Sequence, residues 1–252
     1  MENVSKNQYN AALATRYTSP ERHQNPLQIL AYEAWLREVG DVRGKYIRDM
    51  GCGAGDSTRL LAELHPRRLE GFDYSEEMLS LARSAEVSTP VGISYIQADC
   101  SQVLPDGGRP CECATSMWLY HYAQSEHMLL GFARSTFATL ASSGRVVALT
   151  QNKPASVIRR PGFGELGEWL DTPEQNGSRQ RIILLDAAEN EIASFIIYYW
   201  TTQTYLRIFA EAGFREVEFK QMHFNEETRS LFTQWKEMED SAGCSILTAY
   251  KP

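Results

Sequence analysis

The chain has 252 residues, of which 43% are hydrophobic and 23% are charged, a composition typical of a folded globular protein. This length allows one domain with a sizeable core, so we expect residues 1–252 to form a single domain. The net charge of -7 argues against a nucleic acid as the main partner, because binding phosphates requires a concentrated basic face. The sequence contains neither the apolar core of a signal peptide nor a membrane-spanning stretch, which predicts a cytoplasmic protein without a membrane partner.

The five cysteines are expected to be reduced thiols, because an odd number without a signal peptide is typical of a cytosolic protein. Cys111 and Cys113 form a C-x-C pair, but no second pair of cysteines or histidines accompanies it at zinc spacing. We therefore expect no metal site. Alternation along a strand would place both sulfur atoms on one face.

From residue 45 onward, apolar strand-like segments alternate with amphipathic helical segments, the pattern of a parallel sheet with crossover helices. Ser75 is the expected N-cap of the second helix. The segments predict a doubly wound, Rossmann-like α/β fold with a seven-stranded, mostly parallel sheet. In chain order the first elements are strand 45–50, helix 57–65, strand 69–72, helix 75–84, strand 93–98, strand 112–118, helix 125–141 and strand 145–150.

The pattern changes after residue 150. Residues 151–178 are rich in proline and glycine and predict a loop with a short helix over 163–170. Strand-like segments at 179–187 and 191–200 flank a turn and predict a hairpin. We interpret 151–200 as a substrate-cap insertion and the helical residues 1–40 as a cover over the opposite side. A helix at 202–212 and strands at 216–220 and 245–250 complete the prediction.

The first strand ends in a glycine-rich loop, Asp49-Met50-Gly51-Cys52-Gly53-Ala54-Gly55. Glycines allow the backbone to turn sharply and to approach a ligand closely. The spacing differs from the G-x-G-x-x-G of dinucleotide sites, because Asp56 stands where the third glycine would be. A negative side chain there would repel a pyrophosphate but would tolerate a ligand with an ammonium group.

Acidic residues end three successive strands, which brings them to one edge of a parallel sheet. Asp49 precedes the loop and could engage a cationic ammonium group, directly or through water. Asp73 closes the second strand, where a carboxylate can accept hydrogen bonds from both ribose hydroxyls. Asp99 closes the third strand, where it can accept one from an exocyclic amine. These three acids are far more specific than the glycine loop alone.

Together, residues 48–55, 71–79 and 98–100 resemble the class I S-adenosylmethionine-dependent methyltransferases. The resemblance implies that S-adenosylmethionine is the cofactor and S-adenosylhomocysteine the product. In that family the loop holds the methionine part, and the acids corresponding to Asp73 and Asp99 hold ribose and adenine. Arg48 departs from the usual aliphatic residue, and a buried arginine there would need an acidic partner. The cofactor-binding residues expected are Tyr17, Asp49, Gly51, Cys52, Gly53, Asp73, Tyr74, Met78, Asp99, Cys100, Met117 and Trp118.

An aromatic segment follows the fourth strand, where this fold places the transferred methyl group. We expect catalysis from His121, as a possible general base, and from Tyr122, although His121 could equally be a hydrogen-bonded structural residue. The cap hairpin adds aromatic side chains that could stack on a planar substrate or pack on the sheet. The expected substrate-binding residues are Trp118, Tyr120, His121, Tyr122, Tyr199 and Trp200.

Residues 118–123 and 199–200 and the Lys251-Pro252 ending are similar to the toxoflavin-pathway N-methyltransferases, which methylate ring nitrogens of an azapteridine. This similarity implies natural-product N-methylation of a small planar heteroaromatic molecule. Methylation of oxygen or carbon remains an alternative, as does a cofactor-binding scaffold without turnover. A nucleotide-dependent oxidoreductase is disfavoured by the glycine spacing. The sequence gives neither the substrate nor the oligomeric state.

Overall fold

A seven-stranded sheet forms the centre of the molecule in the computed structural model, which describes residues 26–104, 109–154, 164–186 and 188–252. Its strand order is β3-β2-β1-β4-β5-β10-β9. The first five of these strands are parallel, and β10 runs antiparallel to both β5 and β9. This confirms the predicted fold class. The bounds are β1 Tyr46–Met50, β2 Arg68–Asp73, β3 Ile93–Gln97, β4 Cys111–Met117, β5 Leu140–Gln151, β9 Arg215–Lys220 and β10 Cys244–Tyr250.

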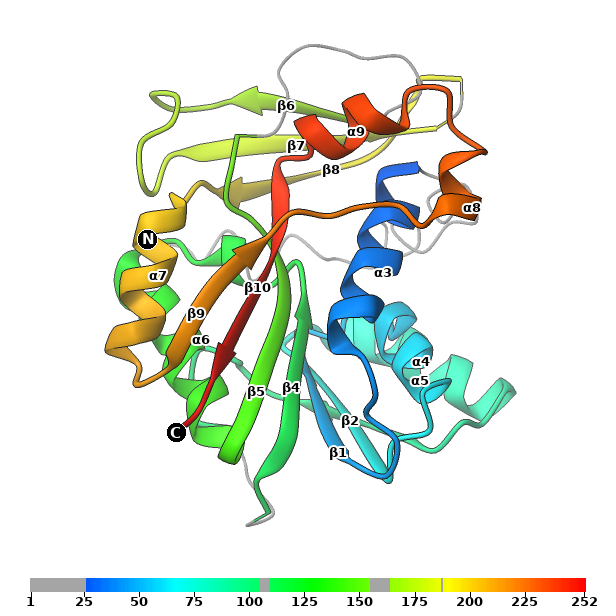
Figure 1. Ribbon diagram of the computed structural model, residues 1–252, viewed down its shortest axis with the longest axis vertical. Coiled ribbons are helices and arrows are strands. Elements are labelled where there is room, and N and C mark those ends of the chain that lie inside the picture. The colour runs from blue at the N-terminus through cyan, green and yellow to red at the C-terminus, as the bar shows by residue number, and fades with distance from the viewer. Residues whose placement is uncertain (1–25, 105–108, 155–163, 187) are drawn as a thin grey trace.

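Helices cover both faces of this sheet (Figure 1). One apolar core lies under α3 (Pro26–Val39), α4 (Asp56–Ala62) and α5 (Glu76–Ser88). The other lies under α6 (Glu126–Thr139) and α7 (Thr202–Glu211). Side chains cap three of these helices as the sequence pattern requires, since Ser75, Ser125 and Thr201 each accept a hydrogen bond from a backbone N–H of the first turn. The predicted cap at Ser75 is therefore present.

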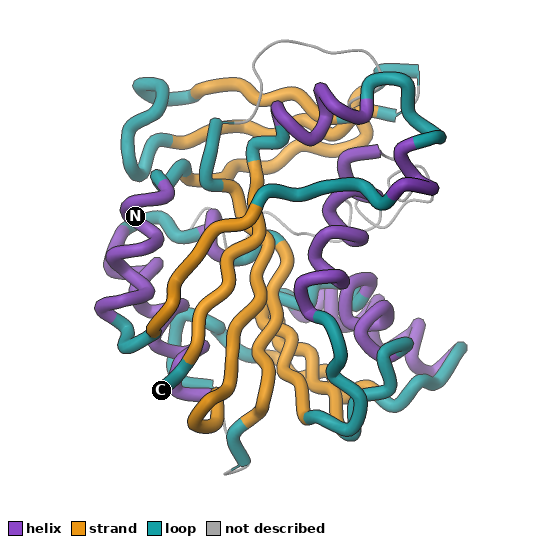
Figure 2. The backbone as a smooth tube through the Cα atoms, in the orientation of Figure 1, coloured by secondary structure: helices purple, strands orange, loops and turns teal. Residues whose placement is uncertain are grey.

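A second, antiparallel sheet of three strands lies across the end of the molecule where β1 and β4 finish (Figures 1 and 2). It consists of β6 (Glu165–Trp169), β7 (Arg179–Leu185) and β8 (Glu191–Tyr198). The expected hairpin of 179–187 and 191–200 is present as β7 and β8. The helix expected over 163–170 is wrong for residues 165–169, which form β6 instead, because pairing with β7 gives their backbone groups partners that the local sequence does not reveal.

Two short helices escaped the sequence prediction, α8 (Glu226–Arg229) and α9 (Trp235–Ser241), which lie between β9 and β10. The expectation that Cys111 and Cys113 share one face is also wrong. Cys111 packs with the core under α6, whereas Cys113 packs with the core under α3, because a register irregularity separates them in the pairing of β4 with β5.

Arg48 lies in the middle of the sheet and is almost completely buried. Its Nε lies 3.2 Å from Oε2 of Glu70 on the neighbouring strand β2, and its guanidinium also donates to the hydroxyl of Thr139. The predicted acidic partner is therefore present, and the central strand keeps its arginine because the charge is paired.

Candidate functional site

The glycine loop crosses from β1 to α4 at the carboxyl edge of the sheet. Gly51, Gly53 and Gly55 all have positive φ values, of 73°, 56° and 89°. Residues with a Cβ rarely adopt this conformation, which explains why three glycines stand at alternate positions. The backbone N–H groups of Gly51 and Cys52 donate to the carbonyl oxygen of Phe72 at 2.7 and 2.9 Å, which ties the loop to β2.

Asp73 at the end of β2 continues this attachment. Its Oδ2 accepts a hydrogen bond of 2.9 Å from the backbone N–H of Gly53, and its Oδ1 accepts one of 2.8 Å from Ser75. Burial raises the pKa of Asp73, and the backbone N–H donors offset part of this effect. The carboxylate is thereby held at the edge of the cavity described next, with lone pairs left to accept from ligand hydroxyls.

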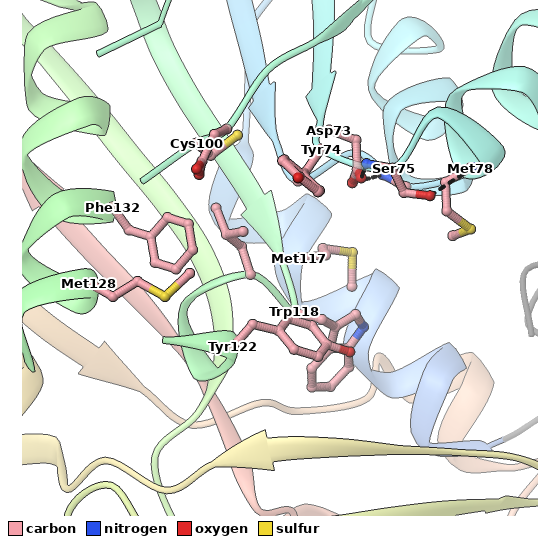
Figure 3. A pocket seen from close by; sticks show the side chains of 14 residues that line it. Asp73, Tyr74, Ser75, Met78, Cys100, Met117, Trp118, Tyr122, Met128 and Phe132 are labelled. Carbon is pink, nitrogen blue, oxygen red and sulfur yellow. Dashed lines mark hydrogen bonds between the residues drawn. The ribbon is translucent and has the colours of Figure 1, made fainter. Parts of the chain in front are cut away.

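A cavity, the first cavity, opens beside the loop (Figure 3). Asp73 lies at one side of it and Trp118 and Tyr122 lie at the other. Asp99 and Cys100 line it at the end of β3, where Oδ1 of Asp99 accepts from the backbone N–H of Ser101 at 3.0 Å. The predicted cofactor residues that line this cavity are Gly51, Gly53, Asp73, Tyr74, Met78, Asp99, Cys100, Met117 and Trp118.

Two predicted cofactor residues do not line the first cavity. Asp49 is completely buried, and its carboxylate accepts hydrogen bonds from the hydroxyls of Thr58 (2.7 Å), Thr115 (2.9 Å) and Ser57 (3.3 Å). It therefore fixes the loop against α4 and β4, and its expected contact with an ammonium group, direct or through water, stays a prediction. Cys52 turns its side chain into the core against Gly71. Tyr17, also predicted to bind the cofactor, lies outside the described residues.

Four residues of the first cavity were missed by the sequence prediction, namely Ser75, Leu119, Met128 and Phe132. Ser75 and Leu119 adjoin predicted positions, so widening the motif by one residue would have found them. Met128 and Phe132 lie one helical turn apart on α6, within the helix predicted over 125–141. α6 packs against the segment that follows β3, where Oγ of Ser135 donates to the carbonyl oxygen of Gln102, and no local motif marks this contact.

Trp118 follows β4 and has a positive φ of 65°, a strained conformation for a bulky residue. It lines the first cavity and also a smaller second cavity. Its indole Nε1 is buried without a hydrogen-bond partner in the part of the chain that the structure describes. The strained backbone thus places one aromatic ring in the wall between two cavities.

His121 lies in the wall of the second cavity and is 1% exposed. Its Nδ1 accepts the backbone N–H of Gln151 at 3.4 Å, while its Nε2 has no partner among the described residues. Burial lowers the pKa of His121 to about 3, so the ring is neutral. With Nδ1 accepting, the proton is on Nε2, and the ring can donate into the cavity. This arrangement argues against a general base at His121 and for a hydrogen-bond donor.

The remaining predicted aromatic residues divide into two groups. Tyr122 lines the first cavity, and its ring centroid lies 4.7 Å from that of His121. Tyr120, Tyr199 and Trp200 are buried and line neither cavity, which corrects their expected role in substrate binding. Tyr120 packs edge-on against Phe209, and Tyr199 against Trp169.

The second cavity also contains residues that the sequence prediction missed. Gln151 ends β5, and its Nε2 is buried without a partner among the described residues. Glu165 begins β6, and burial raises its pKa to about 7. Ile182, Leu184 and Phe195 of the three-stranded sheet supply apolar walls. No local motif marks these residues, because six separate segments meet here only through the tertiary fold.

Other kinds of site find no support in the residues that the structure describes. They contain no group of three or more histidine, cysteine, aspartate or glutamate side chains able to hold a metal ion. None of their helices is long and apolar enough to span a bilayer.

Comparisons with known proteins agree with this geometry. Residues 47–144 match the family model described as a methyltransferase domain. The chain is 29% identical over 174 residues to N-demethylindolmycin N-methyltransferase of Streptomyces griseus, covering 68% of this chain and 70% of that protein. It is 37% identical over 98 residues to trans-aconitate 2-methyltransferase of Acidovorax ebreus, covering 38% of this chain and 34% of that protein. The chain thus spans about a third of one relative and about two thirds of the other.

Solved structures show the same fold. An S-adenosylmethionine-dependent methyltransferase from Mesorhizobium loti superimposes with a TM-score of 0.62 at 21% identity, covering 88% of this chain and 98% of that one. A structure of an amino pentose methyltransferase from Micromonospora echinaspora with S-adenosylmethionine bound gives 0.54 at 16% identity, covering 94% of both chains.

The domain match, the shared fold and the first cavity together support an S-adenosylmethionine-dependent methyltransferase, with S-adenosylmethionine as its cofactor. Residues 47–144, which contain all of the glycine loop and most of β1 to β4, are the part of the chain that matches the methyltransferase domain. The cavity suits this cofactor, because a Cβ on Gly51 or Gly53 would come within 3.1 or 3.2 Å of the side chains of Leu119 and Met78 that border it.

Proposed function

We propose that this chain transfers the methyl group of S-adenosylmethionine to a ring nitrogen of a small, planar heteroaromatic molecule of azapteridine type. The observation that carries the proposal is the aromatic wall of the first cavity, formed by Trp118 and Tyr122, of which Trp118 also lines the second cavity. Flat aromatic side chains favour a flat ligand, because stacked rings bury large apolar surfaces at little entropic cost.

The comparison with N-demethylindolmycin N-methyltransferase supports nitrogen as the acceptor. Its match of 174 residues is longer than the 98-residue methyltransferase domain, so the similarity extends beyond the part that holds the cofactor. The match to trans-aconitate 2-methyltransferase covers only 98 residues, as expected if mainly the cofactor-binding part is shared. A ubiquinone biosynthesis O-methyltransferase of Bordetella avium also matches over 146 residues, but at 23% identity, so the longer and more similar match supports nitrogen as the acceptor.

In this mechanism the bound cofactor supplies an electrophilic methyl group on a sulfonium. The chain's own residues provide alignment, which can supply much of the rate enhancement of such a transfer. Asp73 and Asp99 hold the donor at the ends of β2 and β3. Trp118 and Tyr122 border the acceptor on the side of the donor, and β6, β7 and β8 cover it and exclude water. We accordingly propose that residues 151–200 are a substrate cap over a single methyltransferase domain.

The test is a methyl-transfer assay with S-adenosylmethionine carrying a ¹³C-methyl group. Pteridine, azapteridine and indole compounds would be offered in parallel with catechols and small carboxylic acids. We expect a labelled product from a ring compound, with the ¹³C shift of an N-methyl group. Labelling of only the catechols or acids would show O-methylation and contradict the proposal, and cofactor binding without any labelled product would favour a scaffold.

A further inference from the structure

The second cavity lies where the three-stranded sheet meets the carboxyl edge of the main sheet. The segment after β4 contributes Trp118 and His121, the end of β5 contributes Gln151, and β6 contributes Glu165. The second cavity shares Trp118 with the first, so a molecule inside it adjoins the site that binds the methyl donor.

Three hydrogen-bond donors in its lining have no partner among the described residues. They are the indole Nε1 of Trp118, Nε2 of His121 and the amide Nε2 of Gln151. A buried donor without a partner is unfavourable, and such groups are rare in folded proteins. Three of them around one cavity indicate that a ligand supplies their acceptors. Carbonyl oxygens or unprotonated ring nitrogens would serve.

Glu165 lines the same cavity, and its carboxylate is a hydrogen-bond acceptor. Its carboxyl is half-buried, and none of the described lysine or arginine side chains forms an ion pair with it. The titratable groups near it are the neutral His121 and the thiol of Cys244 on β10, whose pKa Glu165 helps to raise. Lys153, two residues after the end of β5, is exposed, and its charge acts to lower the pKa of Cys244.

We propose that the second cavity is the acceptor pocket of the methyltransferase and that Glu165 binds a ring N–H of the acceptor and takes its proton. This inference rests on the proposed function and names its substrate class: a planar heterocycle whose edge carries carbonyl or imine acceptors beside at least one N–H. The acceptors face Trp118, His121 and Gln151, and the N–H faces Glu165. Ile182, Leu184 and Phe195 cover the faces of the ring.

The reaction balances without any further reactant. The nitrogen forms a bond to the methyl carbon while the bond between that carbon and the sulfonium sulfur breaks, leaving a neutral thioether. The proton of the ring nitrogen passes to the carboxylate of Glu165, which later returns it to water. Burial raises the pKa of Glu165 to about 7, which suits a group that exchanges protons near neutral pH.

The test measures binding separately from turnover. Lumazine, which carries ring N–H groups beside two carbonyls, is the probe, and 1,3-dimethyllumazine, which lacks these N–H groups, is the matched ligand control. Trp118 lies in the wall, so quenching of tryptophan fluorescence reports binding. Glu165→Gln removes the carboxylate, and Glu168→Gln is the matched control, because Glu168 is an exposed residue of the same strand that pairs with Arg181.

We expect wild type to bind lumazine more tightly as the pH rises through about 7. Glu165→Gln should weaken lumazine binding roughly tenfold at pH 8 and remove this pH dependence. Glu168→Gln should leave lumazine binding unchanged, and 1,3-dimethyllumazine should not distinguish the three proteins. S-adenosylmethionine affinity, measured by calorimetry, should be the same in all of them.

Failure of wild type to bind lumazine, or equal lumazine binding by wild type and Glu165→Gln, would overturn the inference. The proposed function can fail independently of it. Lumazine that binds through Glu165 but is never methylated would support the pocket and contradict N-methylation of such rings. Lumazine methylation that is the same in wild type and Glu165→Gln at every pH would support the proposed function and contradict the role given to Glu165.

Discussion

The two cavities of this methyltransferase differ in how they are built. The first is lined largely by residues that directly follow β1, β2, β3 and β4, so each parallel strand delivers its own contribution to one edge of the sheet. The second is lined by α3, the segment after β4, the end of β5 and all three strands of the antiparallel sheet. In our proposal the methyl donor, common to many enzymes, is bound by the regular part of the fold, and the acceptor pocket is assembled from the added parts.

Substitution of Asp49 should have the largest effect, because its carboxylate fixes the glycine loop that borders the first cavity. Asp49→Ala would leave the hydroxyls of Thr58 and Thr115 without their acceptor in a completely buried site. We expect a loss of about 3 kcal/mol in the free energy of unfolding, measured with urea. Asp41→Ala, an exposed carboxylate in the turn before β1, should cost less than about 1 kcal/mol. Weakened cofactor binding with unchanged stability would instead show that Asp49 contacts the ligand.

Asp73 tests the first cavity itself. Asp73→Ala removes the acceptor for ligand hydroxyls and also the partner of the Gly53 N–H. We expect the free energy of S-adenosylmethionine binding to weaken by about 2 kcal/mol, roughly 30-fold in Kd by calorimetry. Asp73→Asn keeps one acceptor oxygen and should lose less. Unchanged affinity in both variants would contradict the assignment of the first cavity to the cofactor.

The sequence predicted the first cavity well because its signals are local. Glycines with positive φ and an acid at the end of a strand can be recognised from spacing alone, and nine predicted residues line the cavity. The burial of Asp49 was not predictable, since it depends on hydroxyls that reach it from α4 and β4. Glu165 was missed because its environment also depends on tertiary contacts. Its strand pairing and its burial arise from segments distant in the chain, and the local sequence favoured a helix.

Glu165 carries a smaller effect that appears only as a pH dependence. Burial raises its pKa to about 7, above the ordinary 4.5, so the folded protein holds this proton more tightly than the unfolded chain. Stability therefore falls as the pH rises from about 4.5 to 7 and is flat above that. The full shift corresponds to about 3 kcal/mol, which solvent screening of a half-buried group reduces to about 1.5 kcal/mol.

Glu165→Gln should consequently be more stable than wild type by about 1.5 kcal/mol at pH 8 and nearly equal to it at pH 4.5, measured by urea unfolding at both values. His121 acts in the opposite direction, because its lowered pKa of about 3 removes stability as the pH falls below about 6.5. Because both proteins contain His121, its contribution cancels in the difference between their free energies of unfolding. A difference that does not change with pH would show that Glu165 is not buried in solution as it is here.

The smallest expected effects come from the same substitution made at two tryptophans, Trp118 in the aromatic wall and Trp200 outside it. Trp200 is buried, and its Nε1 donates a hydrogen bond of 3.0 Å to the carbonyl oxygen of Ala123. Trp200→Phe should therefore lower the free energy of unfolding by about 1 kcal/mol and leave lumazine binding unchanged. Trp118→Phe loses no hydrogen bond within the described residues, so its stability should change by less than about 0.5 kcal/mol while lumazine binding weakens. The opposite result, weaker lumazine binding in Trp200→Phe alone, would return Trp200 to the substrate site and show that the second cavity is not where the acceptor binds.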